Sequence, residues 1–181
     1  GLYTTSGRSG GSLYECSVVL DKNTSVLVSG NSGALGGGAH SSGALIIKNN
    51  TAVTFDNNTA SSGGGAIAVT VENGSAGEYQ GNLAITGNDS IAFTNNTAIG
   101  KGGAIYAAGP VSIKNNGIVS FSGNTSNSGG STYATSAGGG GLAVVYQAIG
   151  NTTYSGTTEI SGNKAVEFKN NVSQANGGAI F

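Results

Sequence analysis

The sequence contains few of the side chains on which most catalytic, metal-binding and nucleic-acid-binding sites depend. Its 181 residues include seven Lys or Arg and eight Asp or Glu, and the charged share of 8% lies far below the roughly 25% of typical soluble domains. Because the formal net charge is −1, nucleic acid is not an expected partner. The single histidine, His40, has no second histidine or cysteine as a co-ligand, so no metal site is predicted.

Cysteine and long apolar runs are also scarce. The one cysteine, Cys16, cannot form an internal disulfide, which excludes a disulfide framework. It alternates with Val18 and Leu20, so we interpret it as a small buried hydrophobic residue, with a reactive or intermolecular thiol as the alternative. No run of 18 apolar residues predicts a membrane-spanning helix. The N-terminus has no signal-peptide pattern and the C-terminus ends inside a repeated motif, so we expect a fragment of a longer protein.

Two short motifs repeat along almost the whole chain, and this self-similarity predicts the fold. In the first motif, an apolar residue is followed three places later by Asn. Four copies carry Phe at the apolar position: Phe55/Asn58, Phe93/Asn96, Phe121/Asn124 and Phe168/Asn171. Eight residues before each of these lies a copy with Ile: Ile47/Asn50, Ile85/Asn88, Ile113/Asn116 and Ile160/Asn163. A weaker pair precedes them: Leu20/Asn23 and Val28/Asn31.

The second motif is a glycine pair followed by Ala and an aliphatic residue. Three complete copies occur: Gly64, Gly65, Ala66, Ile67; Gly102, Gly103, Ala104, Ile105; and Gly177, Gly178, Ala179, Ile180. Each begins nine residues after the Phe of the first motif. Weaker copies are assigned at Gly10, Gly37 and Gly140, so successive glycine pairs lie 27, 27, 38, 38 and 37 residues apart. The basic unit is therefore 27 residues, and later units carry insertions of about ten residues.

Apolar and polar residues alternate just before each Asn, which is typical of short half-buried strands, and Asn, Gly, Ser and Thr between them indicate turns. Three short strands per 27-residue unit predict an all-β fold, a right-handed parallel β-helix of five to six coils that forms a single segment over 1–181. Equivalent residues should stack about 4.8 Å apart, with the four Phe residues in one interior column. Asn suits a left-handed corner and can hydrogen-bond the Asn of the next coil, and glycine allows close stacking.

The joint repetition of the two motifs resembles the passenger domains of chlamydial polymorphic membrane proteins. The sequence departs from that pattern at His40, after Gly37–Ala39, and at Leu142, while Val28 stands where the pattern has Phe. The resemblance implies a surface-exposed passenger of an autotransporter, which a C-terminal β-barrel outside these residues anchors in the bacterial outer membrane. It further implies an adhesin that binds a host-cell receptor of unknown identity and that self-associates, with the repeated motifs associated with adhesion.

No catalytic residue or cofactor is predicted. The glycine motif lacks the Gly-Lys-Ser/Thr sequence of a phosphate-binding loop, because Gly100, Lys101 and Gly102 lead into a strand pattern. A carbohydrate-active enzyme is the main alternative, since β-helices often carry such activity, but it needs converging carboxylates. The outward position after each Ile instead predicts a charge ladder in which Asp21 and Lys48 pair between adjacent coils. A spacer that binds nothing is a further alternative.

The insertions are the candidate partner-binding elements. They occupy roughly residues 68–82, 125–139 and 144–157, and the first and third are expected to leave the same corner two coils apart, roughly 10 Å. Loops on a rigid scaffold often carry recognition, and tyrosine is a favoured contact residue. We therefore predict a shared ridge of partner-binding residues, with loops that bind nothing specific as the alternative. Four of the seven tyrosines lie in the insertions: Tyr79, Tyr133, Tyr146 and Tyr154.

Overall fold

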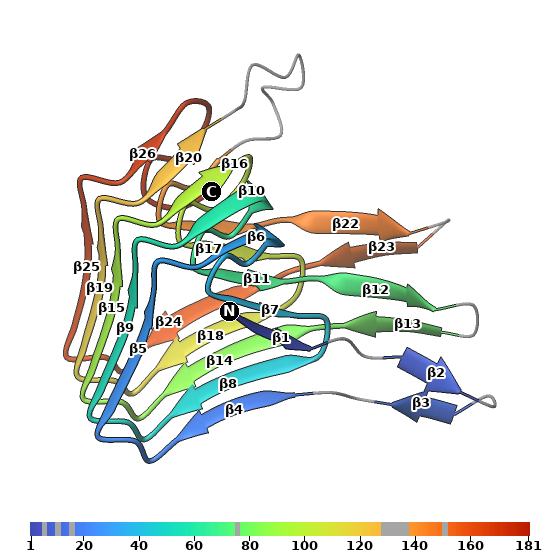
Figure 1. Ribbon diagram of the computed structural model, residues 1–181, viewed down its shortest axis with the longest axis horizontal. Helices are drawn as coiled ribbons and strands as arrows, with labels where there is room; N and C mark the ends of the chain where they lie inside the picture. Colours follow the sequence, from blue (N-terminus) through green and yellow to red (C-terminus); the bar gives the residue numbers. More distant parts are fainter. Residues whose placement is uncertain (5–6, 10–11, 15–16, 75–76, 128–137, 150–151) are drawn as a thin grey trace.

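The computed structural model describes residues 1–4, 7–9, 12–14, 17–74, 77–127, 138–149 and 152–181. All regular structure in these ranges is β-strand, and none of it is a helix that could cross a membrane. Most strands join parallel sheets that run along one stack of coils (Figure 1). The predicted all-β parallel β-helix is therefore confirmed. Cys16 and Tyr133 lie outside the described residues, so the predictions made for them stay predictions.

Each coil contributes one strand to each of four parallel five-stranded sheets. The glycine-motif sheet contains β1 (Leu2–Thr4), β7 (Ala39–Ser41), β11 (Ile67–Val69), β17 (Ile105–Ala107) and β21 (Leu142–Val144). The Ile sheet contains β4 (Val18–Asp21), β8 (Ala44–Lys48), β14 (Asn82–Thr86), β18 (Val111–Lys114) and β24 (Thr158–Ser161). The Phe sheet contains β5 (Ser25–Ser29), β9 (Ala52–Asp56), β15 (Ser90–Thr94), β19 (Ile118–Ser122) and β25 (Ala165–Lys169).

The fourth sheet is a feature that the three-strand prediction did not contain. It consists of β6 (Ser32–Leu35), β10 (Thr59–Gly63), β16 (Thr97–Ile99), β20 (Thr125–Asn127) and β26 (Val172–Ser173). Its inward side chains are small, because Ala60, Ala98 and Ser126 are fully buried where the other sheets place Ile, Leu or Phe. A strand of small residues has no alternation of large apolar and polar side chains, so its sequence pattern predicts a turn.

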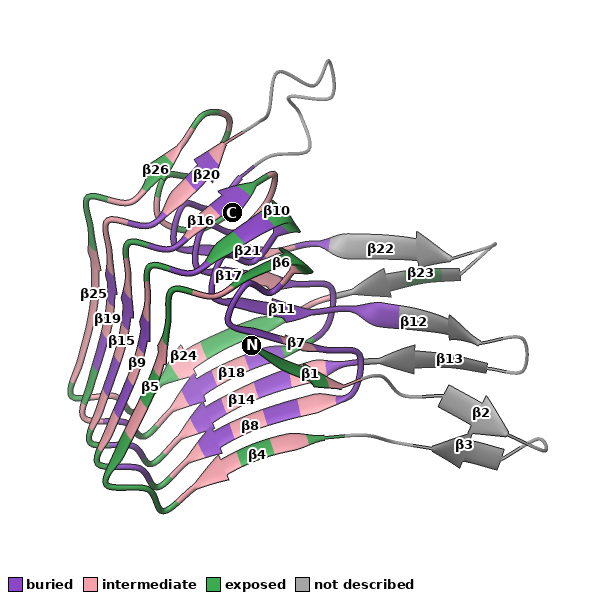
Figure 2. Cartoon of the chain, in the orientation of Figure 1, coloured by how far each residue is buried: buried purple, intermediate pink, exposed green. Residues whose placement is uncertain are grey.

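The described strands form five coils, and Ile180 bridges Leu142 at the start of a sixth. The register between coils follows the motifs. Phe93 pairs with Phe55 on one side and with Phe121 on the other, and Phe121 pairs with Phe168. The four rings form the predicted interior column, with centroids 5.3, 4.8 and 4.6 Å apart and nearly parallel planes. Buried residues run through coils two to four, while coils one and five are more exposed (Figure 2).

Two glycine positions differ by one residue from the predicted register. Ile67 pairs with Ala39 and Ile105 pairs with Leu142, so Gly36 and Gly139 are the counterparts of Gly64 and Gly102. A bulge in β10 is the reason for the first shift: the second coil has one residue more between Ala60 and Gly63 than the first coil has between their partners. In the glycine run near residue 140 the sequence itself left the register ambiguous.

The weak copy assigned at Gly10 is wrong as a coil corner. Ser12 and Leu13 lie in the hairpin strand β3 (Ser12–Tyr14), which pairs antiparallel with β2 (Gly7–Ser9), whereas Leu2 occupies the place in the glycine-motif sheet. The assignment failed because a glycine pair also suits a tight hairpin turn. Gly10 itself lies outside the described residues.

The left-handed corner residue also lies one place before the Asn that forms the ladder. Asn57 and Asn95 have φ of 53° and 54°, whereas Asn58 and Asn96, which follow them, do not have positive φ. The two tasks predicted for a single Asn are thus divided between neighbours. The first residue of each Asn-Asn pair bends the chain, and the second bonds to the adjacent coils.

Candidate functional site

The residues of the glycine motif pack one coil against the next. Gly64, Gly102 and Gly177 have φ of 68°, 66° and 55°, which strongly favours glycine. A Cβ on Gly65 would overlap the carbonyl oxygen of Gly103, and a Cβ on Gly103 would overlap that of Gly140. At this motif the backbones of adjacent coils therefore pass too close to each other for a Cβ.

The Ala and Ile of this motif face the core in the middle coils. Ala66, Ile67, Ala104 and Ile105 have no exposed surface, and the amides of Ala66 and Ile67 both donate to the carbonyl oxygen of Ala104 at 2.9 Å. Ile180, which has no complete coil beyond it, is 43% exposed. Within complete coils, the motif offers no side chain to a partner.

The Asn of the Phe motif forms a continuous ladder along the rod. The Oδ1 of Asn96 accepts from the backbone N–H and from Nδ2 of Asn58, each at 3.0 Å. Its own Nδ2 donates to Oδ1 of Asn124 at 2.9 Å and to the carbonyl oxygen of Phe55 at 3.0 Å. Asn124 in turn donates to Asn171 at 2.9 Å. Because Asn58, Asn96 and Asn124 are buried and fully bonded, these amides also have no capacity for a ligand.

Three β-hairpins project from one side of the rod, where the chain passes from the glycine-motif sheet to the Ile sheet (Figure 1). They are β2–β3, β12–β13 (Val71–Gly74 and Gly77–Gln80) and β22–β23 (Tyr146–Ile149 and Thr152–Ser155). They belong to the first, third and fifth coils, so successive hairpins are two coils, about 9.6 Å, apart. The predicted common corner of the first and third insertions is confirmed, and the hairpin of the first coil joins them. We call these three hairpins the hairpin row.

The structure places three of the four predicted tyrosines on this row. Tyr79 pairs with Glu72, Tyr154 pairs with Gln147 and Tyr146 pairs with Ser155. Tyr79 and Tyr154 occupy equivalent positions. Each lies on the second strand of its hairpin, in the second residue pair counted from the rod. Tyr133 belongs to the insertion between β20 and β21, outside the described residues. The backbone thus brings Tyr79, Tyr146 and Tyr154 to one side of the rod, and their role in binding stays a prediction.

Charged residues on the outer faces pair between and within coils. Lys48 Nζ lies 3.6 Å from the carboxylate of Asp21, which confirms the predicted pair in the charge ladder. Lys114 pairs with Glu159, and Lys169 pairs with Glu167. The hydrogen bond from Lys114 holds the pKa of the Glu159 carboxyl below its ordinary value. In the described ranges, no group of three or more His, Cys, Asp and Glu side chains is placed to hold a metal ion.

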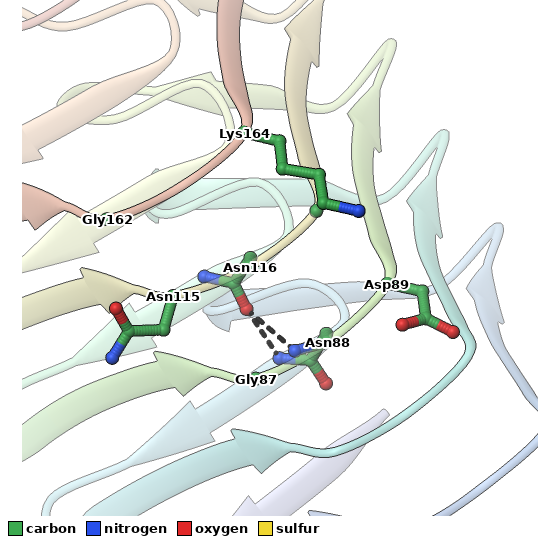
Figure 3. Close-up of a pocket in the computed structure, with 8 residues that line it drawn as sticks. Gly87, Asn88, Asp89, Asn115, Asn116, Gly162 and Lys164 are labelled. Atoms are coloured by element: carbon green, nitrogen blue, oxygen red, sulfur yellow. Dashed lines mark hydrogen bonds between the residues drawn. The ribbon is translucent and has the colours of Figure 1, made fainter.

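A polar groove of about 350 Å³ lies at the corner between the Ile sheet and the Phe sheet, over coils three to five (Figure 3). We call it the corner groove. In the first two coils the same corner positions carry the longer side chains of Lys22, Thr24, Asn49 and Thr51. The corner groove is lined by Gly87, Asn88, Asp89, Asn115, Asn116, Gly117, Gly162 and Lys164. Sequence reasoning missed this groove, although the three glycines in otherwise filled positions were a visible signal.

Comparison with known proteins gives one family match. The model of the Chlamydia polymorphic membrane protein repeat matches residues 52–70, 90–108 and 157–181. Each of these segments contains one Phe motif and the complete glycine motif that follows it. No curated protein and no solved structure is significantly similar to the chain.

Proposed function

Because this chain is a repeat region of the chlamydial polymorphic membrane protein family, we propose that it is a passenger segment of a surface adhesin that attaches the bacterium to host cells. The family implies a protein at the bacterial outer membrane or surface, and it is not a known enzyme family. In the proposal, the coils form a rigid rod and the hairpin row carries the contact with a host-cell receptor.

The arrangement of the hairpins is the observation that supports this proposal. The residues of the family motifs pack inside complete coils, whereas β2–β3, β12–β13 and β22–β23 all project from one corner. Segments that leave a rigid scaffold commonly carry recognition. Receptor binding through the hairpin row leaves the rod free to stack, and it gives the repeated motifs an indirect effect on adhesion through the fold.

The chain offers a matched way to remove hairpins. In the second coil, Ser42 and Gly43 connect the sheets that residues 70–81 connect in the third coil. In the fourth coil, residues 108–110 do what residues 145–157 do in the fifth. Replacing 70–81 by Ser-Gly and 145–157 by Ala-Gly-Pro should reduce attachment of protein-coated beads to cultured epithelial cells to near background, because two of the three hairpins are lost.

The control shortens the insertion at another corner. Residues 128–137 stand where Gly100 alone stands one coil earlier, so they can be replaced by a single Gly. This variant loses only Tyr133 of the four predicted tyrosines, so it should keep most bead attachment. The thermal unfolding midpoint should show that both variants fold. Full attachment of beads that carry the folded two-hairpin replacement would contradict the role of the hairpin row. If the unaltered chain does not attach at all, the segment is a spacer.

The tyrosine residues give a finer test. Replacing Tyr79, Tyr133, Tyr146 and Tyr154 by Ser should lower bead attachment about tenfold or more, because aromatic contacts contribute strongly to protein interfaces. Replacing the same four residues by Phe keeps the rings and should retain most attachment. Equal attachment by the Ser variant and the unaltered chain, with equal unfolding midpoints, would remove these residues from the binding surface.

Self-association, which the family resemblance implies, is part of the proposal but needs a separate measurement. Sedimentation velocity over a range of protein concentrations should detect assembly in solution. Soluble protein added to the bead assay should reduce attachment to cells, because it occupies the same receptor as the protein on the beads.

A further inference from the structure

The corner groove is a cavity that the fold does not fill with its own side chains. Its floor is made by the ladder residues Asn88 and Asn116, whose amides are already bonded: Asn88 Nδ2 donates to Oδ1 of Asn116 at 2.9 Å (Figure 3). Gly117 is required by close packing, since a Cβ there would overlap the carbonyl oxygen of Asp89. The amides of the floor are therefore already hydrogen-bonded, and polar side-chain contacts with a ligand would come from the rim.

Three exposed side chains of different character stand on this rim. Asp89 offers only acceptor oxygens, Lys164 offers only donor hydrogens, and the Asn115 amide offers both. Asp89 and Lys164 follow the ladder Asn of the third and fifth coils, so they flank the gap left by Gly117 in the fourth coil. Asp89 and Lys164 are both exposed, and neither forms an ion pair with another residue in the part of the chain that the structure describes.

We propose that the corner groove binds a neutral saccharide unit. Each hydroxyl of a sugar can donate to a carboxylate and accept from an ammonium group, so one ring can satisfy Asp89 and Lys164 together. One negative and one positive group give the rim no net charge, which favours a neutral ligand over a sulfated polyanion.

The inference rests on the proposed adhesive function for its biological source, a glycan on the host-cell surface. Binding itself does not depend on that function. A single shallow groove with exposed polar groups should bind weakly, with a Kd on the order of millimolar, because charged contacts at exposed sites contribute little. Attachment of a bacterium would then depend on many copies acting together.

The test uses the ¹⁵N-labelled chain and three neutral probes: methyl β-galactoside, methyl α-mannoside and N-acetylglucosamine. At least one should cause saturable shifts of the amide signals of Asp89, Asn115 and Lys164. The D89N/K164Q double variant should bind that probe about tenfold or more weakly, because both charged contacts are lost. No saturable shift with any probe, or shifts confined to residues outside the groove, would overturn the inference.

A matched pair of glycine variants tests the cavity itself. Gly87→Asn fills the corner groove with the residue that the second coil carries at Asn49, at a φ of 66° that Asn tolerates. Gly123→Asn makes the same change at the other Asn corner, also at φ 66° and also beside an Asn of the preceding coil, Asn95. G87N should abolish or strongly weaken binding, and G123N should leave it unchanged. Equal affinities for both variants would contradict the groove as the site.

Two further results separate this inference from the adhesive function. If the chain binds a probe and coated beads do not attach to cells, the adhesive function fails and the saccharide site stands. If beads attach and no probe binds, the saccharide site fails and the adhesive function stands. Stronger binding of heparin than of all three neutral probes at the same residues would overturn the assignment to neutral saccharides.

Discussion

Replacing Gly65 by Ala is expected to destabilise the protein by about 3 kcal/mol or more. The added Cβ would overlap the carbonyl oxygen of Gly103 and would lie 2.6 Å from the backbone nitrogen of Thr97. Both neighbours are backbone atoms in buried coils, so no side chain can turn away, and relief requires the coils to separate. The free energy of unfolding from urea titration, followed by circular dichroism, measures the effect.

Gly30→Ala is the matched control. Gly30 has a φ of 67°, so Ala is strained there, but a Cβ would meet no atom within 4 Å. We expect Gly30→Ala to lower the free energy of unfolding by about 1 kcal/mol, because only the left-handed backbone conformation is unfavourable for Ala there. If Gly65→Ala costs no more than Gly30→Ala, close stacking is not the reason for the glycine motif. A Gly65 variant that folds normally but does not attach to cells would show that the motif contributes to adhesion directly.

Replacing Asn96 by Leu is expected to cost about 4 kcal/mol or more of unfolding free energy. The substitution removes the acceptor for two N–H groups of Asn58 and the donor to the carbonyl oxygen of Phe55. It also removes the side-chain donor to Oδ1 of Asn124. These polar groups lie in the buried interior, where each lost partner costs about 1–3 kcal/mol.

Asn31→Leu makes the same change at the first position of the ladder. Asn31 is partly exposed, and its amide donates to Oδ1 of Asn58 and to the carbonyl oxygen of Ser29. Water can replace these bonds, so the expected cost is about 1 kcal/mol. The difference between the two variants in urea titration measures how much the interior position of the ladder matters. Equal costs would mean that the ladder is not cooperative along the rod.

The fold was predictable because its determinants are local and periodic. The interior column was predicted from four regularly spaced residues, Phe55, Phe93, Phe121 and Phe168, and the ladder from the Asn three places after each of them. In a parallel β-helix equivalent positions of successive coils have the same environment, so the same residue type recurs at each of them. The spacing of the motifs therefore contained most of the architecture.

Features without large side chains were harder to predict. The fourth sheet escaped notice because Ala60, Ala98 and Ser126 face inward where a large residue would have signalled a strand. The corner groove depends on what is absent at Gly87 and Gly117, and its shape follows only when coils far apart in sequence are stacked. Two of the three hairpins, β12–β13 and β22–β23, were expected as insertions, whereas β2–β3 was mistaken for a coil corner. The antiparallel pairing of the hairpins depends on backbone geometry that glycine-rich sequence leaves open.

The position of the hairpins on alternate coils has a consequence for how the surface can change. A two-stranded hairpin is about as wide as two coils are tall, since strands in a sheet and successive coils have the same spacing of about 4.8 Å. Hairpins on the first, third and fifth coils therefore fill the length of that corner, while Ser42–Gly43 and residues 108–110 keep the intervening coils short. We expect the sequence and length of the hairpins to vary more readily than the coils, because the hairpins lie outside the parallel sheets. Variation of this side of the rod is then expected mainly at the first, third and fifth coils, and the coils between them keep short connections.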